Sequence, residues 1–309
     1  MISIVIPIYN SEKNILLLVK NIFEVFKNFE IEINLINDDS KDNTHTECLK
    51  IIEEYHDSIN YIKLRKNVGE HNAVMAGLNE SNGDWTIIMD DDFQNPPSEA
   101  LKLYNYAKQN KFDVIYANYE NKKHSFFRNL GSKLNDLTAN YIFKKPKKLY
   151  LCSFKCISKG ILQEIIKYKG PYPYIDGLIL SITSNIGSVK LEHESRKIGK
   201  SNYSIIKLMK LYANISTNFS TIPIHIFSII GAFISFISFI FGIVIILEKL
   251  FYPNTPVGYS SLIAAIIFFS GIQLIFLGLI GEYIGKILKN VNHEKQYTIE
   301  KKINKNGKK

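Results

Sequence analysis

An apolar run leads into three consecutive acids in the stretch Trp85-Thr-Ile-Ile-Met-Asp-Asp-Asp-Phe-Gln-Asn-Pro-Pro97. Residues 85–89 are β-branched or large and apolar, and such a run is typical of a buried strand. The acids at 90–92 stand where that strand ends. Ligands of open α/β sheets bind outside the carboxyl ends of strands, so this stretch predicts a fold and a site together.

The chain before this stretch alternates strands and helices at regular spacing. We expect strands at 2–6, 32–36 and 59–63, and helices at about 14–26, 46–55 and 72–79. The second strand ends in a polar cluster, Asn37-Asp-Asp-Ser-Lys-Asp-Asn43. This alternation implies a mostly parallel α/β sheet with helices on both faces. Both acidic clusters then lie at carboxyl ends of strands.

Charge and cysteine content narrow the function classes. The net charge of +9 over 309 residues suits anionic partners: nucleotide diphosphates, lipid phosphates or an acidic membrane surface. Nucleic acid is not expected, because the basic residues are scattered and do not interleave with aromatic residues along one element. The three cysteines, Cys48, Cys152 and Cys156, are too few for a disulfide framework and are interpreted as buried thiols.

Two long apolar segments, about 222–247 and 257–281, follow the sheet domain. At about 1.5 Å per residue, each is long enough to cross a hydrocarbon core roughly 30 Å thick. We therefore expect a two-helix transmembrane hairpin within 221–283. The stretch 201–220 before it is amphipathic, which favours a helical region at the membrane interface.

Basic residues set the expected orientation in the membrane. The segment 284–309 is rich in lysine, whereas the link between the two spans carries only Lys249. The positive-inside rule places this basic tail and the domain at 1–200 in the cytoplasm, on an inner or plasma membrane with two spans. The first residues lack a basic start and are interrupted by Pro7, so no signal peptide is expected.

The acidic loop also suggests a metal site. Asp90 and Asp92 are two residues apart beside a loop, and such a pair can hold a hard divalent cation that bridges a pyrophosphate. A solvated acidic turn is the alternative, and this segment alone does not decide between them.

Further motifs occur in a fixed order along nearly the whole chain. They are Ser3–Asn10, Asn37–Thr44, Arg65–Gly69 with Ala73 and Gly77, Gly83-Asp84, Asp90–Pro97, Arg196–Tyr203, Asn218–Pro223 and Gly278–Gly285. This ordered set resembles the inverting glycosyltransferases with a GT-A fold, in particular their polyprenyl-phosphate branch (dolichyl-phosphate mannose synthase-like and bactoprenol glucosyltransferase-like proteins). The resemblance implies a Rossmann-like GT-A domain and metal-dependent sugar transfer with Mg²⁺ or Mn²⁺. It also implies a UDP- or GDP-sugar donor and undecaprenyl or dolichyl phosphate as acceptor.

The resemblance also assigns donor-side residues. Pro7, Tyr9 and Asp38 would contact the nucleoside, with Asp38 accepting from a base or ribose group. Two departures stand beside Asp38: the family often has Gly where Asp39 stands, and Asp where Asn37 stands.

The acidic loop is expected to serve the diphosphate. By the same resemblance, Asp90 and Asp92 would flank the diphosphate and the metal and act in catalysis. Gln94 would be a further metal ligand.

The phosphate of a lipid acceptor needs cations or hydrogen-bond donors, and arginine offers bidentate binding. The candidates are Arg128, Lys155, Arg196, Lys200 and Ser201. Arg196 is the strongest of them, because it lies in a matched motif just before the interfacial stretch.

The nature of the acceptor decides whether a general base is needed. A lipid monophosphate is largely anionic, with a second pKa near 6, so it can attack without a base. A sugar hydroxyl needs one, and Asp176 is the reserve candidate. Trp85 is the single tryptophan, which excludes the Gln-x-x-Arg-Trp motif of processive synthases.

Two other functions stay open beside lipid-phosphate transfer. One is transfer to a hydroxyl of a glycan or glycolipid, and the other is a catalytically silent membrane scaffold. The sequence leaves the sugar undetermined, and a homo-oligomer is a further open possibility.

Overall fold

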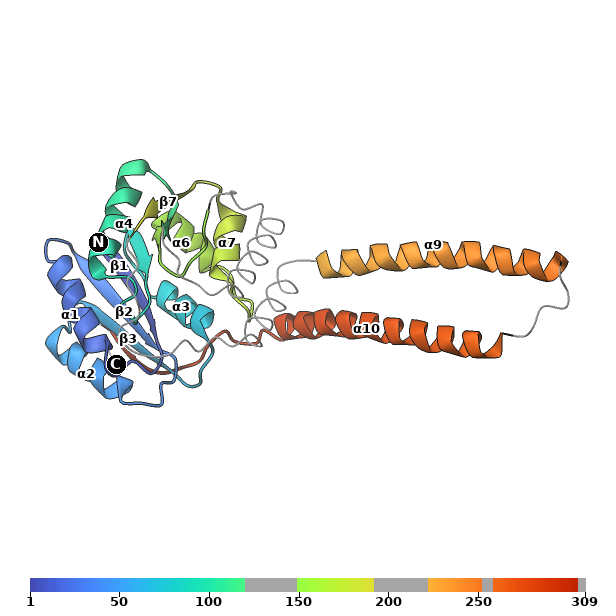
Figure 1. The fold of residues 1–309 in the computed structure, drawn as a ribbon. Coiled ribbons are helices and arrows are strands. Elements are labelled where there is room, and N and C mark those ends of the chain that lie inside the picture. The colour runs from blue at the N-terminus through green and yellow to red at the C-terminus, as the bar shows by residue number, and fades with distance from the viewer. Residues whose placement is uncertain (120–148, 192–221, 252–257, 305–309) are drawn as a thin grey trace. The chain divides into compact units, whose positions relative to one another are not determined.

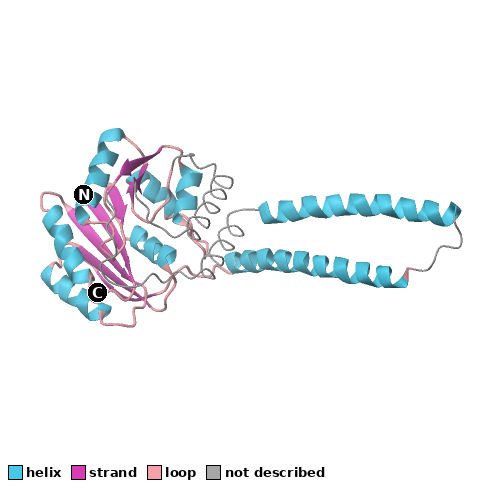
Figure 2. Ribbon diagram, in the orientation of Figure 1, coloured by secondary structure: helices cyan, strands magenta, loops and turns pink. Residues whose placement is uncertain are grey.

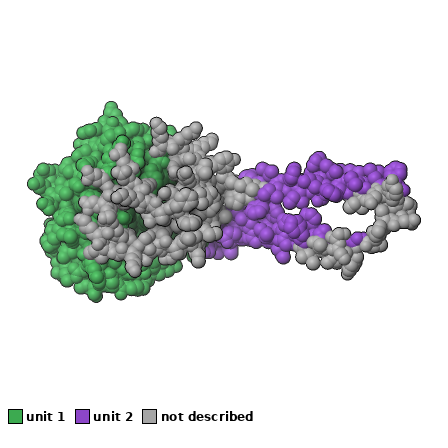
Figure 3. Space-filling model, in the orientation of Figure 1, with its two compact units in different colours: residues 1–204, 293–309 green, residues 205–292 purple. Residues whose placement is uncertain are grey.

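A computed structural model describes residues 1–119, 149–191, 222–251 and 258–304 (Figure 1). The chain divides into two compact units (Figure 3). The first unit comprises residues 1–204 and 293–309, and the second comprises residues 205–292. A segment near the C-terminus thus belongs to the same unit as the N-terminal domain.

The first unit is an α/β domain built on one eight-stranded sheet (Figure 2). Its strands are β1 (Ile2–Ile8), β2 (Ile31–Asn37), β3 (Ile59–Leu64), β4 (Trp85–Ile88), β5 (Val114–Asn118), β6 (Lys155–Ser158), β7 (Ile186–Lys190) and β8 (Ile299–Ile303). Its helices are α1 (Ile15–Val25), α2 (Thr44–Glu54), α3 (Glu70–Asn79), α4 (Pro97–Asn110), α6 (Lys159–Ile165) and α7 (Ile175–Ile182). The four strands and three helices expected before residue 90 are confirmed.

The strand order is β7-β5-β6-β4-β1-β2-β3-β8. β1 pairs in parallel with β2 and with β4, and β2 pairs in parallel with β3. The carboxyl ends of these four strands therefore lie at one edge of the sheet. β6 runs antiparallel between β4 and β5, and β7 pairs in parallel with β5, so the sheet is mixed outside its centre.

Helices cover both faces of the sheet, as Figure 1 shows. Side chains of a strand alternate between faces. Ile4 and Ile6 of β1 belong to the core that includes residues of α1, α2 and α4, whereas Val5 packs with residues of α3, α6 and α7. α3 passes so close to β1 that a Cβ atom at Gly77 would lie 2.4 Å from Val5 Cγ1. Gly77 is thus required by packing, which accounts for its place among the sequence motifs.

The strand β8 completes the sheet beside β3 with antiparallel pairing. The backbone N–H of Arg65 donates to the carbonyl of Thr298 over 2.9 Å, just ahead of the strand. Gln296 Nε2 donates to the carbonyls of Tyr168 and Gly170 over 3.0 and 2.8 Å. The sequence pattern of 284–309 predicts a basic tail, and this strand is an addition that the pattern does not predict.

The second unit contains two long helices, α9 (Ile222–Phe251) and α10 (Tyr259–Val291). The rings of Phe227 and Phe276 meet edge to face between them, with centroids 5.0 Å apart. Many large apolar side chains of both helices are exposed. Within the described residues, Phe268–Val291 is the one segment of suitable length and composition to span a membrane, and its mean hydropathy is 1.5.

The predicted hairpin thus matches the structure in part. α9 covers the first predicted span, and among its described residues Phe227–Phe241 is a shorter apolar segment. The second predicted span ends at residue 281, whereas α10 continues without a break to Val291.

Candidate active site

The loops after β1, β2, β3 and β4 each contain a residue with positive φ. The φ angles are 57° at Asn10, 57° at Asp39, 87° at Gly69 and 61° at Phe93. Asn and Asp tolerate this left-handed region and Gly prefers it, but a bulky residue such as Phe93 is an outlier there. Strained backbone of this kind concentrates at functional sites, and here it lies directly after the acidic triplet.

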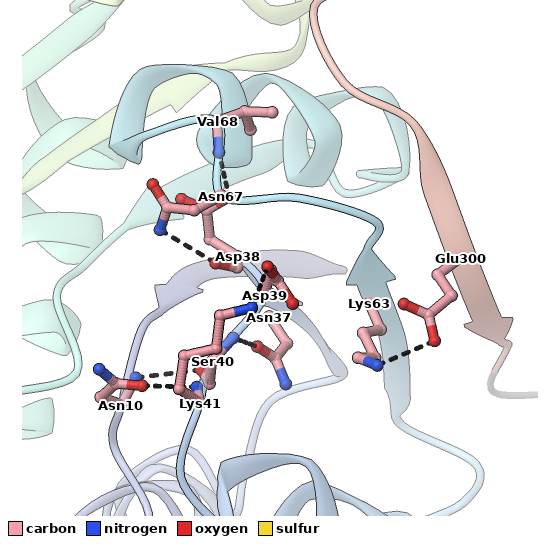
Figure 4. Close-up of polar contacts among 10 residues, drawn as sticks. All are labelled: Asn10, Asn37, Asp38, Asp39, Ser40, Lys41, Lys63, Asn67, Val68 and Glu300. Carbon is pink, nitrogen blue, oxygen red and sulfur yellow. Dashed lines mark hydrogen bonds and ion pairs between the residues drawn. The ribbon is translucent and has the colours of Figure 1, made fainter.

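Hydrogen bonds join the loops after β1 and β2 (Figure 4). The backbone N–H of Asn10 donates to Ser40 Oγ over 3.0 Å, and the N–H of Lys41 donates to Asn10 Oδ1 over 2.8 Å. Within the second loop, the N–H of Ser40 donates to Asn37 Oδ1 over 2.9 Å. The two loops therefore form one connected rim at the carboxyl edge.

Asp38 connects this rim to the start of α3. Its Oδ1 and Oδ2 accept hydrogen bonds from the backbone N–H groups of Val68 and Gly69, over 2.8 and 2.9 Å. The amide of Asn67 donates to the Asp38 carbonyl over 3.1 Å (Figure 4). Burial raises the pKa of the Asp38 carboxyl, and the two N–H groups oppose that shift. Asp38 therefore has a structural role, whatever ligand it contacts.

The other residues expected at the nucleoside lie at the end of β1. Pro7 is half-buried and pairs in register with Ile36 of β2. Tyr9 is 45% exposed, although it directly follows the buried strand β1. Its ring is therefore open to a ligand at this edge.

Each acid of the triplet accepts a hydrogen bond from a different residue. Ser153 Oγ donates to Asp90 Oδ2 over 2.6 Å. Ser11 Oγ donates to Asp91 Oδ2. The backbone N–H of Gln94 donates to Asp92 Oδ1 over 3.0 Å. The bonds from Ser153 and Ser11 attach the acidic loop to two other segments, and the bond from Gln94 closes a turn within it.

The middle acid lies in the least favourable setting for a charge. Burial raises the pKa of Asp91 to about 7, and the negative charges of Asp90 and Asp92 act in the same direction. Hydrogen bonds from Ser11 and from the backbone of Tyr9 oppose the shift. Three carboxyl groups lie close together in one loop, so a bound positive charge would stabilise their ionised forms.

The residues of this loop fit a divalent ion that a substrate helps to bind. Within residues 1–119, 149–191, 222–251 and 258–304, no group of three or more His, Cys, Asp or Glu residues could hold a metal alone. Magnesium is usually held by one or two carboxylates together with substrate phosphates, and its remaining ligands are waters. Asp90 and Asp92 supply the carboxylates for such a site, with the Gln94 side chain half-buried beside them.

A buried ion pair lies on the neighbouring strand. Lys155 of β6 stands opposite Ile88 of β4 and is 2% exposed. Its ammonium pairs with Asp176 Oδ1, and the Tyr116 hydroxyl donates to the same oxygen over 2.8 Å. The ammonium also lies 5.0 Å from the centroid of the Tyr116 ring. The two residues expected as phosphate ligand and reserve base are thus partners.

Two residues of the first turn of α3 were missed by the sequence analysis. Burial, together with the charges of Asp90 and Asp176, raises the pKa of Glu70 to about 7, whereas Lys155 opposes the shift. The His71 ring meets the Tyr174 ring edge to face at 5.4 Å, and burial lowers the pKa of His71.

The position of Glu70 in the sequence carried a usable signal. It directly follows Gly69, which ends the matched motif Arg65–Gly69 and opens a helix at the carboxyl edge of the sheet. Four of the acceptor-side candidates lie outside the described residues: Arg128, Arg196, Lys200 and Ser201.

Known proteins share both the sequence pattern and the fold. Residues 3–166 match glycosyl transferase family 2. A Photorhabdus laumondii protein named undecaprenyl-phosphate 4-deoxy-4-formamido-L-arabinose transferase is 30% identical over 309 residues, covering 99% of this chain and 95% of that protein. A protein of the same name from Proteus mirabilis is 30% identical over 308 residues, covering 98% and 94%.

Solved structures support the fold independently. Glucosyl-3-phosphoglycerate synthase from Mycobacterium tuberculosis, in complex with Mn²⁺, uridine diphosphate and phosphoglyceric acid, has a TM-score of 0.53 at 15% identity. The match covers 70% of this chain and 76% of that chain. The same enzyme with phosphoglyceric acid has a TM-score of 0.51 at 14% identity, covering 70% of this chain and 78% of that chain.

These similarities agree with the motifs and with the position of the acidic loop. The family match covers more than half of the chain, and the similarity to whole relatives extends over nearly all of it. The chain therefore belongs to glycosyl transferase family 2 and is a sugar-transferring enzyme.

Proposed function

We propose that this enzyme transfers a sugar from a nucleotide-sugar donor to undecaprenyl phosphate at the cytoplasmic face of a membrane. The observation that carries the proposal is the similarity to undecaprenyl-phosphate sugar transferases over 99% of the chain, because it includes the helices as well as the sheet domain. A relative that shared only the nucleotide-binding part would support no particular acceptor.

The donor side of the proposal rests on the rim after β1 and β2. Tyr9 offers an exposed ring for a base to stack on. Asp38, whose backbone N–H donates to the carbonyl of Ile8, the residue before Tyr9, is an acceptor of hydrogen bonds. The structural neighbour was solved with uridine diphosphate, which favours a UDP-sugar, and a GDP-sugar is the alternative.

The diphosphate would lie against the acidic loop. A bound Mg²⁺ or Mn²⁺ would supply positive charge between the diphosphate and the carboxylates of Asp90 and Asp92. The hydrogen bonds that Ser153 and the Gln94 backbone make keep these two carboxylates oriented before the donor binds. Preorganised ligands of this kind lower the reorganisation needed during reaction.

The transfer itself needs no general base on the protein. An oxygen of the lipid phosphate forms a bond to the anomeric carbon while the bond from that carbon to the diphosphate oxygen breaks. The electron pair of the broken bond leaves with the nucleoside diphosphate, and attack from the opposite face inverts the anomeric configuration. The acceptor oxygen is already anionic, so no proton has to be removed.

The acceptor side requires cations near the membrane. We assign this role to Arg128, Arg196 and Lys200, with Ser201 as a further donor and Lys155 as a buried positive charge. Arginine suits the role because its planar guanidinium binds two phosphate oxygens at once.

The helices of the second unit would hold the enzyme at the lipid. Exposed apolar faces as large as those of α9 and α10 are stable only when lipid or protein covers them. We propose that both helices cross the bilayer, that both termini are cytoplasmic, and that copies of the chain associate through this unit. Anchoring places the site where the lipid headgroup lies, which supplies proximity.

A transfer assay tests the proposal directly. The purified full chain would be mixed with undecaprenyl phosphate, Mn²⁺ or Mg²⁺, and a panel of radiolabelled UDP- and GDP-sugars. We expect an organic-extractable labelled lipid from at least one donor, and loss of about 100-fold or more in rate for Asp92→Asn. Asp57→Asn, at an exposed site, is the matched control. The absence of labelled lipid with every donor would refute the proposed acceptor.

A further inference from the structure

Two carboxylates in the site have oxygen atoms that no described residue binds. Asp176 Oδ1 accepts from both Lys155 and Tyr116, whereas no hydrogen bond among the described residues reaches Oδ2. No hydrogen bond or ion pair in the same set involves the Glu70 carboxylate. Each group therefore retains unused capacity to accept hydrogen bonds.

The setting of Asp176 fixes the direction of its unused oxygen. The residue is 7% exposed, and a buried carboxylate requires compensation for its charge and its lone pairs. Lys155 and Tyr116 supply that compensation at Oδ1 from two neighbouring strands. Lys155 and Tyr116 act as positioning residues, because they leave Oδ2 as an acceptor held in one orientation.

Glu70 approaches the same region from another element. It opens α3, and the turn before it is fixed by the two hydrogen bonds from Val68 and Gly69 to Asp38. The Glu70 carboxylate is close enough to Asp176 and Asp90 for their charges to act on it. Solvent reaches its side chain, although the surrounding protein partly desolvates the carboxylate. Two acceptors from α3 and α7 thus lie near the acidic loop.

The chemistry of these acceptors indicates which part of a donor they meet. Carboxylates repel phosphate groups, so they do not bind a diphosphate or a lipid phosphate without a cation between them. They accept hydrogen bonds from O–H and N–H groups. In a nucleotide-sugar, the transferred sugar carries such groups beside the diphosphate.

We propose that Asp176 Oδ2 and the Glu70 carboxylate bind hydroxyl or amide N–H groups of the transferred sugar. This inference rests on the proposed function and names its substrate class. Above about pH 7, where Glu70 is ionised, the pair disfavours sugars that carry a carboxylate, because like charges repel at short range.

Donor binding tests the inference without any lipid. The full chain in detergent with Mn²⁺, at a pH above the raised pKa of Glu70, would be titrated calorimetrically with UDP, UDP-glucose and UDP-glucuronate, and with GDP, GDP-mannose and GDP-mannuronate. We expect the wild type to bind the neutral sugar of one pair at least 10-fold more tightly than its uronate. Asp176→Asn and Glu70→Gln should each reduce that ratio at least threefold and leave the affinity for the nucleoside diphosphate within twofold.

Matched variants separate recognition from folding. Asp176→Asn leaves the Lys155 ammonium buried without its partner, so the double variant Lys155→Met/Asp176→Asn, which removes both charges, is measured beside it. Glu164→Gln removes one negative charge from an exposed position of α6 and should leave the ratio unchanged.

Three other outcomes overturn the inference, and a fourth bears on the proposed acceptor alone. An unchanged ratio in the Glu70 variant and in the double variant would exclude sugar recognition by these acids. Loss of turnover in Asp176→Asn with the binding ratio intact would identify a base instead. The inference is also refuted if the wild type binds the neutral sugar and the uronate equally tightly in both pairs. A wild type with the expected ratio but no lipid product would refute the proposed acceptor alone.

Discussion

Asp38 Oδ2 lies 2.9 Å from the backbone nitrogen of Gly69, so the end of β2 is bonded directly to the residue before α3. Its partner oxygen makes an equivalent bond to Val68. Asp38→Asn turns one acceptor into an N–H donor that faces another N–H. We expect a loss of about 1–3 kcal/mol in unfolding free energy, measured as a lower thermal midpoint in detergent.

The neighbouring acid provides the control for this prediction. Asp39 forms an ion pair with the exposed Lys41, and such pairs contribute little to stability. Asp39→Asn should therefore leave the midpoint almost unchanged. Equal effects of the two variants would contradict the structural role of Asp38.

Gly77→Ala should weaken the packing of α3 on the sheet. The new Cβ would lie 2.4 Å from Val5 Cγ1 and 3.1 Å from Ile36 Cγ1, so both side chains or the helix must shift. Overpacking of this kind costs about 1–3 kcal/mol. Chemical denaturation of the purified chain would measure the loss.

Gly160→Ala is the opposite case within α6. No atom lies within 4 Å of the Cβ position there, and alanine favours a helix over glycine by about 1 kcal/mol. We expect this variant to be as stable as the wild type or more so. A stable Gly77→Ala variant would show that α3 is less closely packed than described.

Gln296→Ala should loosen β8 from the sheet. The side chain donates to the carbonyls of Tyr168 and Gly170, and removing it leaves two carbonyls without these bonds. Hydrogen–deuterium exchange should become at least several-fold faster in β8 and at the Arg65 amide, which bonds to Thr298. Lys295→Ala, at an exposed neighbouring position, should leave exchange unchanged.

Glu70→Gln should stabilise the chain increasingly as the pH rises. Burial and the charge of Asp90 raise the pKa of Glu70 from 4.5 to about 7. Between these values the unfolded chain releases its proton while the folded chain keeps it, so the wild type loses stability as the pH rises. Below pH 4.5 both states are protonated, and above about pH 7 the loss is complete.

The measurement is the difference in thermal midpoint between variant and wild type in metal-free detergent solution. It should be near zero at pH 4.5 and grow until about pH 7. Glu53→Gln, on the exposed face of α2, should give a difference that does not change in this range. A constant difference for Glu70→Gln would contradict the assigned environment.

The local sequence pattern was sufficient to predict the central strands but not the edge strand β8. β1 to β4 are short runs rich in β-branched residues and are followed by turn residues, so composition and flanking turns identify them as strands. β8 reads Ile299-Glu-Lys-Lys-Ile303, with charged residues between two apolar ends. It is a strand because β3 offers it a free edge, and no local pattern encodes that edge.

Some features of the site could likewise be predicted from local sequence, and others could not. The position of Asp90 and Asp92 in one loop after β4 was predictable from the sequence, and their roles stay a prediction. The pairing of Lys155 with Asp176 was not, since it depends on β6 lying between β4 and β5. The structure also explains the departure at Asp39, whose φ of 57° is a conformation that glycine favours and aspartate tolerates.

The pairing of β8 with β3 sets the order in which the chain can fold during its synthesis. Lys63 and Glu300, which form an ion pair between the two strands (Figure 4), are 237 residues apart. A ribosome that adds about 5–20 residues per second needs roughly 10–50 s to cover that interval. The outer edge of β3 stays unpaired until α9 and α10 have been synthesised, because β8 follows them in the chain. The sheet is therefore completed only after both helices are available for insertion into a membrane.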